Sequence, residues 1–166
     1  MENSAGFLGF CEGNYSGKDL KLFRMKFINK ITQHFFVSAQ IEHRDAGVAA
    51  EQGIKTIICN RPDNEATDQP FTQDLEDAAT AAGINYLHVP VPSKSISDEN
   101  VVEFAAAYES AEGPILAFCR TGMRSTILWA LAEVESHGVN AILAITKESG
   151  YDLSKLRPRL EARVAK

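Results

Sequence analysis

Short apolar runs alternate with helix-length segments along most of this chain, and that alternation limits the fold more than any other feature. Strand-like runs rich in β-branched and aromatic residues are expected at 35–39, 54–59, 84–89 and 115–118. Helices are predicted at 43–52, 73–82, 97–110, 125–137, 140–149 and 153–165. Because a helix-length crossover separates each strand from the next, the sequence predicts an α/β fold. Its sheet is mostly parallel, with about four to five strands and helices on both faces.

The first thirty residues have a different character. Residues 1–17 hold four glycines and no clear period, so a weakly packed tail is expected. Residues 18–30 carry five basic residues and one acidic residue, and Leu20, Phe23, Phe27 and Ile31 fall at helical spacing. This basic amphipathic segment is interpreted as packing on the domain, with a membrane-surface or partner helix as the alternative. Residues 31–166 are predicted to form a single domain.

Composition excludes several functional classes. The chain has 166 residues and a net charge of −5, which disfavours a nucleic-acid partner. It contains no apolar run long enough to span a membrane and no leader-like start, so a cytoplasmic location is expected. Three distant cysteines predict neither a disulfide framework nor a zinc site. No metal or cofactor is expected, because a glycine-rich nucleotide motif is also absent. The oligomeric state is left open.

The most informative segment comes after the last predicted strand, where Cys119 is succeeded by Arg120-Thr121-Gly122-Met123-Arg124-Ser125. Gly122 permits the positive φ that a tight anion-binding turn requires. Backbone N–H groups in such a turn, together with the start of the next helix, form a cradle for an anion. The same groups favour the thiolate form of Cys119.

These residues can be given chemical roles. Cys119 is the candidate nucleophile, and Arg124 is the side chain whose planar fork can hold the oxygens of an anionic substrate. The residues predicted to bind the substrate through the loop are Arg120, Thr121, Gly122, Met123 and Ser125. Ser125 could hydrogen-bond the thiolate or cap the helix. A structural cysteine beside a surface arginine is the weaker interpretation of this segment. It is the favoured one for Cys59, which is expected in the core, while Cys11 in the tail is expected to be inert.

The chain resembles the phosphatase-like domain family of the beta-lactamase-hydrolase-like proteins, within the cysteine phosphatase and rhodanese group. The resemblance covers roughly residues 35–135 and rests on five motifs. They are Val37-Ser38-Ala39-Gln40, Gly53-Ile54-Lys55-Thr56-Ile57-Ile58, Asn60-Arg61-Pro62-Asp63, Gln69-Pro70 and Phe118 to Ser125. It implies a tyrosine-phosphatase-like fold, and either phosphatase or sulfurtransferase activity.

Loop length and overall resemblance point in different directions. Cysteine phosphatases place the arginine six residues after the cysteine, whereas Arg124 lies five after Cys119, an arrangement similar to rhodanese. We therefore expect a cysteine-dependent phosphatase-like hydrolase acting on a small anionic, phosphorylated substrate. One alternative is a sulfurtransferase with a Cys119 persulfide, and another is a non-catalytic module that binds anions or docks a partner.

A phosphatase also needs a general acid for the leaving oxygen. Asp63 is the candidate, because its loop comes after the strand ending at Cys59 and should open at the same sheet edge as Cys119. A simple turn role after Pro62 is the competing interpretation. Asp98 and Glu99 are expected instead to complement the dipole of the helix that they begin. Arg61 could contact a substrate anion or form a surface salt bridge.

Overall fold

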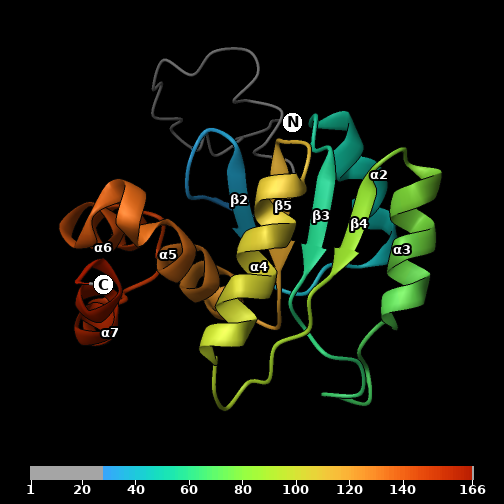
Figure 1. The fold of residues 1–166 in the computed structure, drawn as a ribbon. Helices are drawn as coiled ribbons and strands as arrows, with labels where there is room; N and C mark the ends of the chain where they lie inside the picture. Colours follow the sequence, from blue (N-terminus) through green and yellow to red (C-terminus); the bar gives the residue numbers. More distant parts are fainter. Residues whose placement is uncertain (1–27, 166) are drawn as a thin grey trace, which may run out of the picture.

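A five-stranded sheet forms the centre of the protein in a computed structural model that describes residues 28–165. The strands lie in the order β1-β2-β5-β3-β4 (Figure 1). Their bounds are Ile28–Lys30 for β1, Phe35–Ser38 for β2, Thr56–Cys59 for β3, Asn85–His88 for β4 and Ile115–Phe118 for β5. All neighbours pair in parallel except β1, which pairs antiparallel to β2 at the edge. The predicted α/β class and mostly parallel sheet are thus confirmed.

The register of the central strands brings their carboxyl ends to one level of the sheet. Ser38 of β2 and Cys59 of β3 both lie opposite Phe118 of β5. Cys119 therefore leaves the sheet between two neighbouring strand ends. Open parallel sheets form their sites at this edge, where successive loops can meet.

Helices cover both faces of the sheet, as the sequence predicts. The helices are α2 (His43–Glu51), α3 (Thr72–Ala81), α4 (Asp98–Ser110), α5 (Met123–His137), α6 (Val139–Glu148) and α7 (Arg157–Val164), with the 3₁₀ turn η1 (Ser154–Leu156) before α7. Helix α2 packs with α3, whereas α5 contacts α4, α6 and α7. Figure 1 shows α4 in front of the sheet, with α6 and α7 on the opposite side of the molecule from α3.

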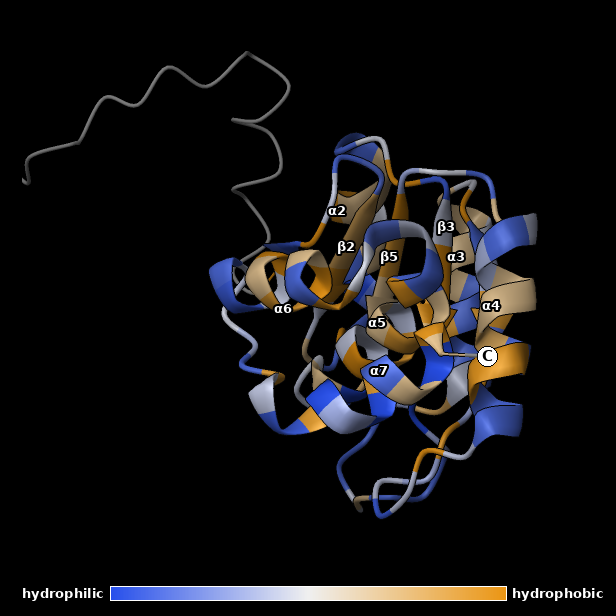
Figure 2. Cartoon of the chain, turned by 60° about the vertical axis from the view of Figure 1, so that its left-hand side comes forward, coloured by the Kyte–Doolittle hydropathy of each residue, from blue (hydrophilic) through white to orange (hydrophobic). Residues whose placement is uncertain are grey.

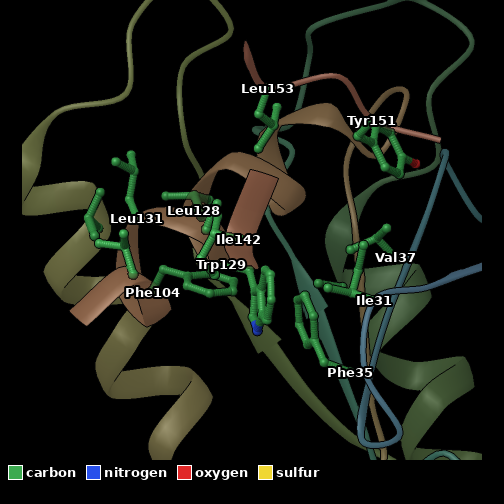
Figure 3. Close-up of a cluster of buried hydrophobic side chains, with 14 of the residues drawn as sticks. Ile31, Phe35, Val37, Phe104, Leu128, Trp129, Leu131, Ile142, Tyr151 and Leu153 are labelled. Carbon is green, nitrogen blue, oxygen red and sulfur yellow. The ribbon is translucent and has the colours of Figure 1, made fainter. Parts of the chain in front are cut away.

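Side chains that alternate along each strand supply two separate cores. Phe35 and Val37 belong to the larger core with Trp129, while Phe36 and Cys59 belong to the smaller one beside α2 and α3. Figure 3 shows the larger core, in which Phe35 stacks on Trp129 with ring centroids 5.9 Å apart. In Figure 2 the central strands β2 and β5 are coloured as hydrophobic, whereas much of α7 is hydrophilic. Burial on both sides explains why the central strands are apolar throughout rather than alternating in polarity.

Several sequence-based boundaries differ from the structure by a few residues. Residues Ile28–Lys30 pair with β2 as a strand, so the helical spacing does not correspond to a helix there, and the sheet includes the last three residues of the basic amphipathic segment. Helix α5 begins at Met123, two residues before the predicted start. Helix α3 begins at Thr72, one residue before the predicted start, and Phe71 is its N-cap. Residues 1–27, including Cys11, lie outside the described part of the chain.

No helix between residues 28 and 165 is both long and apolar enough to cross a membrane.

Candidate active site

Cys119 lies at the bottom of a short loop between β5 and α5, defined here as the Cys119 loop (residues 119–124). Its side chain is buried, with 1% of the residue exposed. The Sγ atom accepts a hydrogen bond from the backbone N–H of Gly122 at 3.1 Å. A backbone donor that points at the sulfur stabilises a negative charge there, as expected for a nucleophilic thiolate.

The loop can take this shape because of Gly122, which has a φ of 88° and caps the N-terminus of α5. This left-handed conformation is costly for other residues, and the N–H of Gly122 itself is the backbone donor that reaches Cys119. The positive end of α5 therefore begins within the loop itself. Placing the helix start at Met123 also puts Arg124 and Ser125 in its first turn, which fixes their side chains on a rigid element.

Arg124 is buried and held from two sides. Its guanidinium donates to both oxygens of Glu65, at 2.7 and 2.8 Å, and to the carbonyl of Val91 at 2.7 Å. Burial works against the charge of Arg124, but Glu65 and the Cys119 sulfur outweigh it and raise the pKa of the guanidinium. Hydrogen bonding to Arg124 lowers the pKa of the Glu65 carboxyl in turn. Glu65 thus occupies the bidentate position in which Arg124 could hold a substrate oxyanion.

Arg61 completes this charged cluster from the neighbouring loop (residues 60–70). It is 5% exposed, and its Nε donates to Glu65 at 3.0 Å while another nitrogen donates to Gln40 at 2.8 Å. The predicted ion pair of Arg61 exists, but it is buried rather than on the surface. The cluster contains two arginines and one carboxylate, so it retains a net positive charge beside Cys119.

Ser125 has a different role from either one predicted. Its hydroxyl donates to Oδ1 of Asn60 at 2.8 Å, and both residues are fully buried. The single proton of this hydroxyl is therefore used between α5 and the end of β3, and is directed neither to the thiolate nor to the helix start. The Asn60 amide group also donates to the carbonyl of Val89 at 3.0 Å. Asn60 therefore connects α5 to the segment that comes after β4.

Tyr151 supports the Cys119 loop from the opposite end of the chain. Its hydroxyl donates to the carbonyl of Thr121 at 3.2 Å and accepts from the side-chain amide of Asn29 at 2.9 Å. A Cβ atom on Gly122 would overlap this hydroxyl. Gly122 is thus required twice, for its backbone conformation and for the close approach of Tyr151.

Asp63 lies on the predicted loop, but its carboxylate contacts another element. Its Oδ1 accepts from the backbone N–H of Thr72 at 2.9 Å, at the start of α3. Within residues 28–165, no hydrogen bond or ion pair joins Asp63 to the Cys119 loop. The carboxylate of this loop that does reach Arg124 is Glu65, two residues further on.

The sequence reasoning missed Glu65, Asn60 and Tyr151. Glu65 could have been noticed from its spacing of four residues after Arg61 in a loop already singled out. Tyr151 carries no such local signal, since it lies about thirty residues from the loop that it supports.

Arg120, Thr121 and Met123 are exposed and, with Arg124, form one wall of a pocket of about 400 Å³. The rest of its lining includes residues 93–96 before α4, together with Leu156 and Arg159. The pocket offers a substrate access to the loop that holds Cys119. Among residues 28–165, no three His, Cys, Asp or Glu side chains are arranged to hold a metal ion.

Comparison with known proteins identifies relatives of this arrangement. The family described as "Beta-lactamase hydrolase-like protein, phosphatase-like domain" matches residues 27–136. A beta-lactamase hydrolase-like protein of Agrobacterium fabrum is 31% identical over 138 residues, which cover 82% of this chain and 32% of the relative. The chain thus spans about a third of the length of the curated relatives that it matches.

Solved structures agree on the fold. The crystal structure of a candidate phosphatase from Neisseria meningitidis Z2491 has a TM-score of 0.73 and 36% identity, covering 82% of this chain and 97% of that one. The structure of Tk-PTP in its active form has a TM-score of 0.62 at 16% identity, covering 84% of this chain and 97% of that one, and supports the fold alone. The tyrosine-phosphatase-like fold is thereby confirmed.

Proposed function

Because the chain belongs to the phosphatase-like domain family of the beta-lactamase hydrolase-like proteins, we propose that it hydrolyses a phosphate monoester with Cys119 as the nucleophile. The hydrogen bond from Gly122 to the sulfur carries this proposal. It gives the Cys119 sulfur a backbone donor, which favours the thiolate form that a nucleophile needs. A buried structural thiol would instead act as a donor or have apolar neighbours only.

The reaction proceeds in two displacements. The Cys119 thiolate attacks phosphorus and forms an S–P bond while the P–O bond to the alcohol breaks, and the departing oxygen receives a proton from a general acid. Water then attacks phosphorus and the S–P bond breaks. This second step releases inorganic phosphate and restores the thiolate, so neither an oxidant nor a cofactor is consumed.

The loop amides and Arg124 stabilise the charge that develops on the transferring group. For this, substrate oxygens replace the Glu65 carboxylate in the fork of Arg124. Glu65 can remain bound to Arg61, which lies 3.0 Å from it in the free protein. Such an exchange keeps both arginines paired with and without substrate, which limits the desolvation cost of binding.

Asp63 is the general acid in this proposal, supported by its position on the loop that comes after β3. Its remaining carboxylate oxygen is available while the other caps α3. Asp63→Asn should slow hydrolysis of an alkyl phosphate far more than that of an aryl phosphate, because only the poorer leaving group needs protonation. The same comparison of alkyl and aryl phosphates with Glu65→Gln tests the other carboxylate of this loop. Equal effects of Asp63→Asn on the two esters would remove Asp63 from the mechanism.

A sulfurtransferase is the second candidate, supported by the five-residue spacing from Cys119 to Arg124. Here the thiolate attacks the outer sulfur of thiosulfate, releases sulfite and holds a persulfide. Cyanide then takes that sulfur as thiocyanate. The backbone of the Cys119 loop would then surround the persulfide, which is smaller than a phosphoryl group.

One paired assay distinguishes the candidates. The purified chain receives an aryl phosphate in one reaction and thiosulfate with cyanide in another, each beside a Cys119→Ser control. Phosphate release that the control lacks is the expected result. Thiocyanate formation without phosphate release would replace the proposal with the second candidate. Activity in neither reaction, with oxyanion binding retained, would indicate a non-catalytic module.

A further inference from the structure

The pocket beside the Cys119 loop carries more positive charge than one phosphoryl group requires. Four of its lining residues are cations, and none is a carboxylate. They are Lys94, Arg120, Arg124 and Arg159. The concentration is notable in a chain whose net charge is −5. Like charges around one cavity repel each other, so this arrangement favours an anionic occupant.

The cations occupy two separate positions. Arg124 is buried with Cys119 and serves the transferring phosphoryl group. Lys94 and Arg120 are exposed, and neither forms an ion pair with any carboxylate in residues 28–165. Their charges therefore remain available to a ligand in the outer part of the pocket.

Arg159, another of the lining cations, is held in place by two contacts. One guanidinium nitrogen donates to the carbonyl of Ile96 at 2.7 Å, and the other pairs with Asp98 at 2.9 Å. These contacts join α7 to the segment that carries Lys94. They hold Arg159 beside that segment, where Arg159 and Lys94 both line the pocket.

The volume and the apolar lining of the pocket indicate what kind of molecule would fit between its cations. A volume of about 400 Å³ falls at the lower end of the range for small-molecule sites. Ile96, Ile127 and Leu156 add apolar surface to the same pocket. The pocket thus offers apolar contact for a small carbon framework, with cations at two positions for its charged groups.

Resting on the function proposed above, we infer that the substrate is a small molecule with a second phosphate group besides the one that Cys119 attacks. Lys94, Arg120 and Arg159 form the subsite for that second phosphate. An acidic phosphopeptide would satisfy the charges as well, but the small volume of the pocket favours the small molecule.

A matched substrate pair tests the inference. The full chain is assayed with fructose 1,6-bisphosphate and fructose 6-phosphate, and kcat/KM for the first should exceed that for the second about tenfold or more. Lys94→Glu should remove most of that preference. Lys155→Ala, which removes a nearby cation outside the pocket, should leave the ratio within about twofold.

Binding to the Cys119→Ser variant gives a readout that does not depend on turnover. Calorimetry should show the bisphosphate binding about tenfold more tightly than the monophosphate, with the difference reduced by Lys94→Glu. Equal affinities, or a preference insensitive to Lys94, would overturn the subsite even if phosphate release depends on Cys119. Stronger binding of an acidic phosphotyrosine peptide than of the bisphosphate would assign the pocket to a protein substrate instead. If the chain showed the binding preference but no hydrolysis that depends on Cys119, only the proposed function would be contradicted.

Discussion

Cys59 and Cys119 stand at the ends of neighbouring parallel strands, yet the protein surrounds them in opposite ways. Both are buried, with 3% and 1% of the residue exposed. The Cys59 thiol donates to the carbonyl of Arg61 at 3.4 Å, and burial raises its pKa. The Cys119 sulfur accepts from the N–H of Gly122 instead. Burial works against ionisation of Cys59, whereas a backbone N–H beside the sulfur is what the proposed Cys119 thiolate requires.

The difference originates in the backbone on the C-terminal side of each cysteine. Cys59 faces the smaller core beside α2 and α3, and its strand continues into a loop that starts with Asn60 and Arg61. Cys119 is succeeded within three residues by a glycine of positive φ and then by the first turn of α5. The residues after each cysteine thus bring a different backbone group to its sulfur, a carbonyl to Cys59 and an N–H to Cys119.

Serine substitution at each cysteine is the largest expected contrast. Cys119→Ser should lower kcat for phosphate release by at least about 10⁴-fold, because a serine hydroxyl is not ionised at neutral pH. Cys59→Ser retains a donor for the Arg61 carbonyl and should change kcat less than about threefold, at a stability cost of about 1 kcal/mol. Steady-state kinetics and urea unfolding measure both. A comparable loss of kcat in the two variants would contradict the assignment of Cys119 alone.

Glycine substitution tests the turn itself. Gly122→Ala should lower kcat/KM about 10- to 100-fold, because it strains the backbone and displaces Tyr151. Gly53→Ala is the matched control: its φ of 87° is nearly the same, and no atom lies within 4 Å of the added Cβ. The control should reduce stability by about 1 kcal/mol but leave kcat/KM within about twofold.

Tyr151→Phe extends that experiment, since it removes the hydroxyl that the new methyl group would meet. The double variant Gly122→Ala/Tyr151→Phe should therefore recover part of the lost activity. If the double variant were no more active than Gly122→Ala, the overlap with Tyr151 would not be the cause of the loss.

Alkylation compares the two thiols directly. In a Cys11→Ser background at pH 7, iodoacetamide should modify Cys119 about tenfold faster than Cys59, because burial raises the pKa of Cys59 and keeps it protonated. Mass spectrometry of peptides over time gives both rates. Inorganic phosphate should protect Cys119 only, and faster modification of Cys59 would reverse the comparison.

Glu65 lies on the loop after Cys59 and pairs with Arg124 beside Cys119. Its titration is expected to give the smallest effect, a change in stability with pH. Because Arg124 lowers the pKa of Glu65, its ionised form stabilises the fold above the usual carboxyl pKa. That stability is lost as the pH falls through the lowered pKa. Glu65→Gln should reduce Tm by about 2–4 °C at pH 7 and by progressively less below about pH 4. Glu51→Gln, at an exposed carboxyl that forms no ion pair within residues 28–165, should show no such pH dependence.

Local sequence was enough to predict the fold class and the Cys119 loop. Apolar strands, helix-length crossovers and terminal glycines are all short-range signals, and residues 119–125 are contiguous, so their proximity needs no folding to be inferred. The edge strand β1 was missed because its three residues continue a helical spacing. Their strand conformation is set by pairing with β2, which is not visible in a window of neighbouring residues.

The sequence by itself determined that a cysteine, a glycine and an arginine would share one turn after a buried strand. Only the tertiary structure decided which groups surround that turn. Glu65 reaches Arg124 across 59 positions of the chain, and Tyr151 reaches Thr121 across 30. Asn60 receives the Ser125 proton across 65. The physical reason is that chain connectivity fixes the spacing within a turn, whereas hydrogen bonds between distant segments depend on strand order and on how the helices pack.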